Sequence, residues 1–153
     1  MSCKSCFLRY ALSASAALLF ASLSSAHAGV VLISDDEGRL PPPQQVASSR
    51  GITRAPRIEL SPLDDGQLHS PIHFKLTFRA FGGSTIDPNS LTMTYLRSSG
   101  VDLTSRVRPY ANAQGIDILD AEAPPGEHMI KVTISDSEGR QGVASFTLTV
   151  TPN

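Results

Sequence analysis

The sequence predicts an all-β protein built as an antiparallel β-sandwich of about seven strands. Between residues 57 and 151, apolar and polar residues alternate with the period of two that half-buried strands require. Turn-forming residues (Gly, Pro, Asp, Asn and Ser) separate the alternating runs. No stretch after residue 28 has a convincing helical spacing, so we expect no helices in the folded domain.

The alternating runs define the expected strands in chain order. The clearest is 72–80, where Ile72, Phe74 and Leu76 alternate with polar residues. The strongest local prediction is the last hairpin, whose two strands bracket a turn at 136–142. The expected strands are 57–60, 72–80, 91–95, 101–107, 116–118, 130–134 and 146–150. The expected turns are 62–66, 82–83, 87–89, 98–100, 124–126 and 136–139. Seven short strands in roughly 95 residues have the size and rhythm of an immunoglobulin-like sandwich.

Two segments resemble parts of bacterial Ig-like domains. Residues 124–133, 136–140 and 144–150 resemble the closing hairpin, and 61–66 with the strand 72–78 resemble the first hairpin. The resemblance covers residues 56–151 and implies an immunoglobulin-like fold. Modules of this family serve as spacers, adhesin stalks, enzyme accessories and binding domains, so the resemblance implies no particular function.

The start of the chain has the features of a secretory signal. Lys4 and Arg9 form a basic head, and the apolar run Tyr10–Leu23 is too short and too rich in serine to span a bilayer. Small residues follow at Ala26 and Ala28, the pattern that signal peptidase accepts, so we expect cleavage directly after Ala28. This style of signal favours a bacterial protein released into the periplasm or outside the cell, without a membrane anchor after cleavage.

The charge and cysteine content narrow the function classes. Cys3 and Cys6 lie in the basic head and would leave with the signal, so we expect no disulfide. Loss of Lys4 and Arg9 leaves 13 − 2 = 11 basic against 14 acidic residues, a net charge of −3. This weak negative charge indicates no nucleic-acid partner.

The expected domain organisation is a signal peptide at 1–28, an extended Pro-rich N-terminal arm at 29–56 and an Ig-like β-sandwich domain at 57–153. In the arm, Val30–Ile33 is a short β-like run, Asp35–Gly38 reads as a solvated turn, and Pro41–Pro43 favours a stiff spacer over a recognition ligand. We expect a tether that is not needed for folding. Val30–Ile33 would add a strand to the domain's own sheet or to a partner's.

Searches for catalytic motifs are negative. The sequence has no G-x-S-x-G motif, no P-loop and no dinucleotide-binding fingerprint, and no cysteine follows the signal. We therefore expect no enzymatic activity, no catalytic residues and no cofactor.

Three histidines follow the expected cleavage site. His69 lies in a turn, and His73 is out of phase with its apolar neighbours and should face solvent. His128 is in phase with Ile130, so it should point into the core and donate an imidazole N–H to a backbone group of the preceding corner. Histidines on opposite faces do not predict a shared metal site.

Acidic residues gather at three places: Asp64 and Asp65; Asp117, Asp120 and Glu122; and Asp136 and Glu138. Calcium held by Asp120, Glu122 and a neighbouring loop is one interpretation, although the spacing matches no EF-hand loop. Solvated acidic turns are the interpretation that we favour.

Arg106, Arg108 and Tyr110 alternate along one run. They would suit binding of an anion or a glycan. We favour a charged edge strand that blocks aggregation, since Pro109 is typical of such an edge.

Both hairpins also resemble those of CopC-type periplasmic copper carriers. The family uses an N-terminal histidine together with an Asp-x-His pair in the last hairpin. Cleavage after Ala26 would expose His27, but the turn here reads Asp136-Ser137-Glu138 and has no histidine. Because the ligand set is incomplete, no metal site is predicted.

The sequence thus predicts an exported, non-enzymatic interaction module whose binding residues are unknown. Its expected partner is an envelope protein or a polysaccharide. The alternative is a periplasmic protein that binds copper or calcium.

Overall fold

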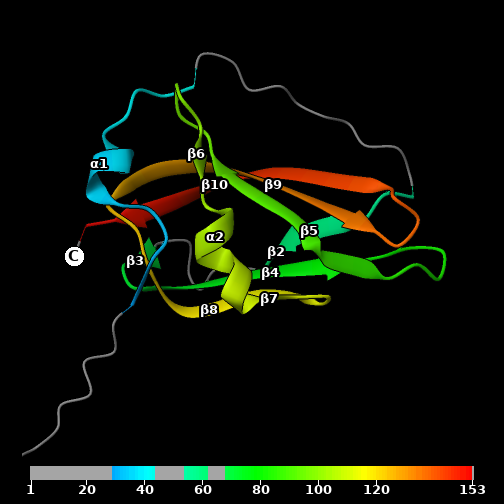
Figure 1. The fold of residues 1–153 in the computed structure, drawn as a ribbon. Coiled ribbons are helices and arrows are strands. Elements are labelled where there is room, and N and C mark those ends of the chain that lie inside the picture. The colour runs from blue at the N-terminus through cyan, green and yellow to red at the C-terminus, as the bar shows by residue number, and fades with distance from the viewer. Residues whose placement is uncertain (1–28, 44–53, 62–67, 153) are drawn as a thin grey trace, which may run out of the picture.

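The fold is a sandwich of two β-sheets, seen in a computed structural model that describes residues 29–43, 54–61 and 68–152 (Figure 1). The all-β sandwich expected from the sequence is confirmed. The strands are β1 (Val30–Val31), β2 (Arg57–Leu60), β3 (Leu68–His69), β4 (Ile72–Arg79), β5 (Ile86–Tyr95), β6 (Val101–Asp102), β7 (Ala111–Asn112), β8 (Gly115–Glu122), β9 (Gly126–Asp136) and β10 (Gln141–Thr151). The helices are α1 (Asp35–Gly38), α2 (Thr104–Val107) and the 3-10 helix η2 (Arg108–Tyr110).

One sheet has the order β1-β8-β4-β2, with β7 also beside β8, and the other has the order β3-β10-β9-β5-β6. Most neighbours are antiparallel, but β1 runs parallel to β8 and β3 runs parallel to β10. The predicted last hairpin is confirmed, since β9 and β10 pair over ten residues of each strand. Between the sheets, the rings of Phe74 and Phe146 lie 6.1 Å apart.

Period-two alternation accounts for the core. In β4 every second residue from Ile72 to Phe78 is buried, and the residues between them face outward. Burial of these apolar side chains stabilises the sandwich by roughly 25 cal/mol per Å² of apolar surface removed from water. The alternation breaks at Leu119 and Asp120 of β8, which are both exposed because the register against β4 shifts there.

The turn expected at 87–89 is instead part of β5. The strand begins at Ile86, and its register against β9 shifts between Asp87 and Thr92. Within this irregularity, Asp87 Oδ1 accepts a hydrogen bond from the Asn89 amide. The turn residues therefore produce a local distortion of one strand and do not end it.

The strand expected at 101–107 ends at Asp102. Thr104–Val107 forms α2, and Arg108–Tyr110 forms η2, so the interpretation of a charged edge strand is wrong, as is the expectation of no helices. Leu103 and Val107, four residues apart, are both buried, which is the spacing of a helical turn. The Asp102 carboxylate also accepts a hydrogen bond from the Thr104 amide at the start of this turn.

The described part of the expected arm, residues 29–43, packs on the sandwich and is no tether. Val30 and Val31 pair with Ala121 and Glu122, so the predicted strand joins the chain's own sheet. Leu32 and Ile33 are 0% and 2% exposed and belong to the core. The expected solvated turn is the short helix α1. Farther on, the Pro41 carbonyl accepts a hydrogen bond from the Ser98 amide of the β5–β6 turn.

Several predicted features lie outside the described residues. They include the signal at 1–28 with His27, the stretch 44–53 and the Asp64–Asp65 turn. Among the described helices, none has the length and apolar character needed to cross a membrane.

Candidate functional site

His73 and His128 occupy the environments that the sequence predicts, whereas His69, expected in a turn, lies on strand β3. His73 is half exposed on the outer face of β4, and its Nε2 lies 2.7 Å from Asp117 Oδ1. His128 is 1% exposed, at the start of β9. His69 is exposed on β3, with its Nδ1 3.2 Å from the Thr151 hydroxyl. In the described part of the chain, no histidine belongs to a group of three or more His, Cys, Asp or Glu side chains that could hold a metal ion.

His128 lies at the centre of a chain of hydrogen bonds. Its Nε2 is 2.7 Å from the Pro124 carbonyl, which confirms the predicted bond to the preceding corner. A carbonyl only accepts, so Nε2 carries the proton and Nδ1 accepts a hydrogen bond, at 2.9 Å, from the Tyr95 hydroxyl. That hydroxyl in turn accepts one from Arg97 Nε. Both ring nitrogens are used inside the protein, which indicates a structural histidine.

The surroundings of His128 favour its neutral form. Burial is the largest influence and lowers the pKa of His128 below its usual value. The hydrogen bond to Pro124 raises this pKa, and the positive charge of Arg97 lowers it. The net lowering keeps the imidazole neutral near pH 7.

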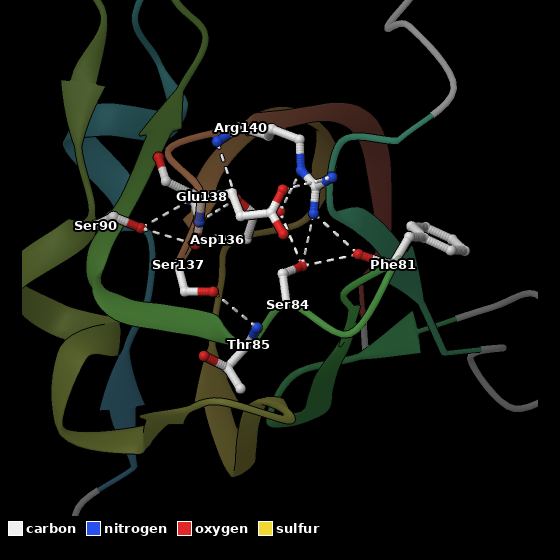
Figure 2. A network of polar contacts seen from close by, with 9 residues as sticks. Phe81, Ser84, Thr85, Ser90, Asp136, Ser137, Glu138 and Arg140 are labelled. Carbon is white, nitrogen blue, oxygen red and sulfur yellow. Dashed lines mark hydrogen bonds and ion pairs between the residues drawn. The ribbon is translucent and has the colours of Figure 1, made fainter.

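At the opposite end of the sandwich, Asp136 and Arg140 hold the β9–β10 turn against the β4–β5 loop (Figure 2). Asp136 Oδ2 accepts hydrogen bonds from Arg140 Nε at 2.8 Å and Ser84 Oγ at 3.0 Å. Its Oδ1 accepts from the backbone amides of Glu138 and Arg140. Arg140 also donates to the Phe81 carbonyl. The network therefore joins two loops that are far apart in the sequence.

These contacts set the charge state of Asp136. Burial, the largest influence, raises its pKa, but hydrogen bonds from Arg140, Ser84 and the Glu138 amide together lower the pKa below its usual value. Because both oxygens of Asp136 already accept two hydrogen bonds, its carboxylate serves the turn here.

The acidic residues of β8 do not converge on one point. Asp117 forms ion pairs with His73 and with Lys75 Nζ, at 2.7 and 3.2 Å, on the outer face of the sheet. The hydrogen bonds from His73 and Lys75 lower the pKa of Asp117. In the described part of the chain, no group of three or more His, Cys, Asp or Glu side chains could hold a metal ion. The calcium interpretation therefore finds no ligand cluster there.

A cleft of about 520 Å³ lies beside the start of α1. Helix α1 and strand β3 lie at the same end of the sandwich (Figure 1). The cleft is bordered by β1 and the start of α1, by the β3–β4 turn and by the β8–β9 turn. The lining residues are Val31, Ile33, Ser34, Asp35, Ser70, Pro71, Glu122, Ala123, Pro124 and Pro125. A concave, mainly apolar site with a few polar groups is typical of ligand-binding sites.

Local hydrogen bonds hold the walls of this cleft in place. The Ser34 hydroxyl accepts from the Glu37 amide, while the Glu37 carboxylate accepts from the Ser34 amide, which forms a capping box at the start of α1. Across the cleft, the Ser70 hydroxyl accepts a hydrogen bond from the Ala123 amide. Gly38 lies against Pro124, where an added Cβ would be 2.8 Å from the proline ring. These contacts fix the segments that line the cleft relative to one another.

Two carboxylates, Asp35 and Glu122, border the cleft, and both side chains are exposed. Within the described ranges, neither forms an ion pair, whereas the neighbouring Glu37 is paired with Arg106. The lining of the cleft therefore combines apolar side chains with two carboxylates that form no ion pair within the described ranges. Comparison with family models, with curated proteins and with solved structures finds no match to this chain.

The sequence singled out Glu122 but not the cleft. In the sequence, Asp35 is only one of several acidic residues of a predicted solvated turn. It lines the same cleft as Glu122 because β1 pairs with β8. The one usable signal is the run Val30–Ile33, whose apolar character predicts that the acidic turn after it is held close to a sheet.

Proposed function

We propose that this protein is an exported, non-enzymatic binding module whose cleft holds a basic segment of an envelope protein. One observation carries the proposal: the cleft is lined by apolar residues and by two carboxylates, Asp35 and Glu122, that form no ion pair within the described chain. The two-sheet sandwich also supports an immunoglobulin-like module. Export rests on the secretory signal that the sequence predicts.

The chemistry of the lining favours a polypeptide over a polysaccharide. None of the described lining residues is aromatic, so the cleft offers no ring for a sugar to stack on. Pro71, Pro124 and Pro125 instead provide rigid apolar surface for the aliphatic stem of a lysine or arginine. The charged end of such a side chain would reach the carboxylates of the cleft.

The hydrogen bonds around the cleft support binding without covalent catalysis. The hydroxyls of Ser34 and Ser70 each accept from a backbone amide. His128, behind Pro124, uses both of its ring nitrogens internally. A serine nucleophile needs an adjacent general base. The two internal hydrogen bonds of His128 leave this histidine no ring nitrogen for that role.

The test uses two synthetic octapeptides, one alternating lysine with valine and the other glutamate with valine. Binding to the mature protein is measured by calorimetry, and the binding site is located by NMR shifts of the backbone amides of residues 31–35, 122 and 123. We expect the lysine peptide to bind in the cleft and the glutamate peptide not to bind. Asp35→Lys should weaken binding of the lysine peptide roughly tenfold, since it replaces attraction by repulsion.

The matched control is Asp36→Lys, the same charge change one residue farther along α1. Asp36 is 96% exposed in its side chain, outside the cleft lining, so this variant should bind within about twofold of the wild type. Equal binding of both peptides, equal weakening by both variants, or NMR shifts away from the cleft would contradict the proposal.

A further inference from the structure

Gly29, the first described residue, packs directly against the side chain of Glu122. A Cβ built on Gly29 would lie 2.5 Å from Glu122 Oε1 and 3.0 Å from its Cδ. The Gly29 nitrogen is bonded to the same Cα, so bond lengths place it within about 5 Å of this carboxylate oxygen. Any larger residue at position 29 would displace the Glu122 side chain.

The position of Gly29 is set by the strand that follows it. Val30 and Val31 pair in parallel with Ala121 and Glu122. The amides of Leu32 and Ile33 both donate to the Glu122 carbonyl, at 2.9 and 3.2 Å, and both side chains are buried. Leu32 and Ile33 therefore contact the backbone of Glu122, while Gly29 contacts its side chain.

The carboxylate beside Gly29 belongs to Glu122. In the described ranges, neither Glu122 nor the nearby acidic residue of the same strand, Asp120, takes part in an ion pair, and the same holds for Asp35, which lines the cleft with Glu122. Arg106 is engaged with Glu37 and the Leu32 carbonyl. A cation at Gly29 would therefore lie beside the Glu122 carboxylate, which forms no ion pair within the described ranges.

We propose that cleavage before Gly29 creates an α-ammonium group that binds the Glu122 carboxylate and fixes the edge strand β1. This inference rests on the export that we propose above. Hydrolysis breaks the C–N bond between Ala28 and Gly29; water gives its hydroxyl to the Ala28 carbonyl carbon and a proton to the Gly29 nitrogen. The new amine binds a further proton below about pH 8 and then has three donors in place of one amide N–H.

This arrangement divides the two carboxylates of the cleft between two cations. The chain's own amino terminus takes Glu122, and Asp35 is left for the basic group of the partner. The precursor, in which residue 29 is part of a neutral peptide bond, has no such cation beside Glu122. Maturation would therefore both anchor β1 and reduce the negative charge at the cleft.

The experiment exports the full 153-residue chain from a bacterial host, determines the mature mass, and titrates the Gly29 α-amine by NMR. We expect a chain that begins at Gly29 and a titration midpoint above the ordinary 7.7–8.0 of an α-amine. Glu122→Gln should lower this midpoint by about 0.5 pH unit, and about 1 M salt should lower it in the wild type as well. Glu127→Gln, the same change at an exposed residue of β9, should leave it unchanged.

The outcomes separate this inference from the proposed function. A Gly29 chain whose midpoint is the same in the wild type, in Glu122→Gln and at high salt overturns the pairing but leaves export intact. A chain that is exported but starts at another residue also overturns the pairing. A chain that stays inside the host with all 153 residues contradicts the proposed export and this inference together. Should Glu122→Gln fail to fold, the salt dependence of the wild type decides.

Discussion

Arg106 and Glu37 form a two-pronged ion pair that ties the N-terminal segment to helix α2. Nη2 of Arg106 lies 2.7 Å from Oε1 of Glu37, and Nη1 lies 2.8 Å from Oε2. The same guanidinium donates to the Leu32 carbonyl at 2.9 Å. Residues expected to belong to a free arm and to an exposed edge strand thus hold each other in place.

Replacing Glu37 with glutamine should make folding less sensitive to acid. The hydrogen bond from Arg106 lowers the pKa of Glu37 from 4.5 to about 2, against the opposing effect of burial and with help from Ser34. A lowered pKa means that the stabilisation is complete above pH 4.5 and is lost as the pH falls towards 2. Urea unfolding should show Glu37→Gln about 1 kcal/mol less stable at pH 6 and nearly equal to the wild type at pH 2.

Asp36→Asn is the control for this change. Its carboxylate pairs with Arg39 at 3.6 Å on the surface, so the free energy of unfolding should change by only a few tenths of a kcal/mol. A loss at Asp36 as large as that at Glu37 would show that general surface charge, and not the pair with Arg106, carries the effect.

Substitution of His128 should behave as a core mutation. His128→Ala removes a buried ring and leaves the Tyr95 hydroxyl and the Pro124 carbonyl without their partner. We expect a loss of about 2–4 kcal/mol in thermal or urea unfolding. An unchanged melting temperature would refute the structural role of this histidine.

His128 should also make the stability of the protein fall as the pH drops below about 6.5. Its pKa is lowered mainly by burial, so the unfolded chain takes up a proton at a higher pH than the folded protein does. Stability is therefore complete above the unfolded value near 6.5 and falls as the pH drops below it. His128→Gln should remove this slope, while His73→Gln, at an exposed histidine, should keep it.

Asp136→Asn should loosen the loops at the other end of the sandwich. Asparagine has one acceptor oxygen, so its NH₂ would face hydrogen-bond donors that the aspartate now accepts from. We expect the melting temperature at pH 7 to fall by about 10 °C. Glu138→Gln changes a half-exposed carboxylate that touches the same arginine, and a fall as large in this variant would argue against the buried network as the cause.

Leu32→Ala tests whether the N-terminal segment is part of the fold. Leu32 is fully buried, so its truncation should cost about 2–5 kcal/mol. Val31, its neighbour in sequence, is 48% exposed, and Val31→Ala should cost much less. If both variants have the same urea midpoint of unfolding as the wild type, the packing of this segment does not contribute to stability.

The strands could be predicted because burial on one face leaves a period of two in the sequence. The strand expected at 57–60 coincides with β2. The last hairpin contains the alternating residues Ile130, Val132 and Ile134, as predicted. Helix α2 could not be predicted in the same way, since a four-residue turn has too few positions to establish a helical period. Arg106, Arg108 and Tyr110 alternate in sequence but lie on two short helices.

The candidate site was less accessible to sequence reasoning than the core was. The bond from His128 to its corner could be predicted because both partners lie within four residues. The cleft depends on β1 lying beside β8 and on α1 packing against Pro124, and both contacts join residues far apart in the chain. The pattern of apolar and polar residues within one strand does not indicate which distant strand it will pair with.

The parallel pairing of Val30 with Ala121 also constrains the order of folding. Whichever compartment the chain folds in, Val30 leaves the ribosome early, and its partner strand follows only after most of the domain has been made. Until β8 is in place, Leu32 and Ile33 have no finished core to enter and remain open to other contacts. A chaperone that shields these first apolar residues would therefore act on the step that closes the sandwich.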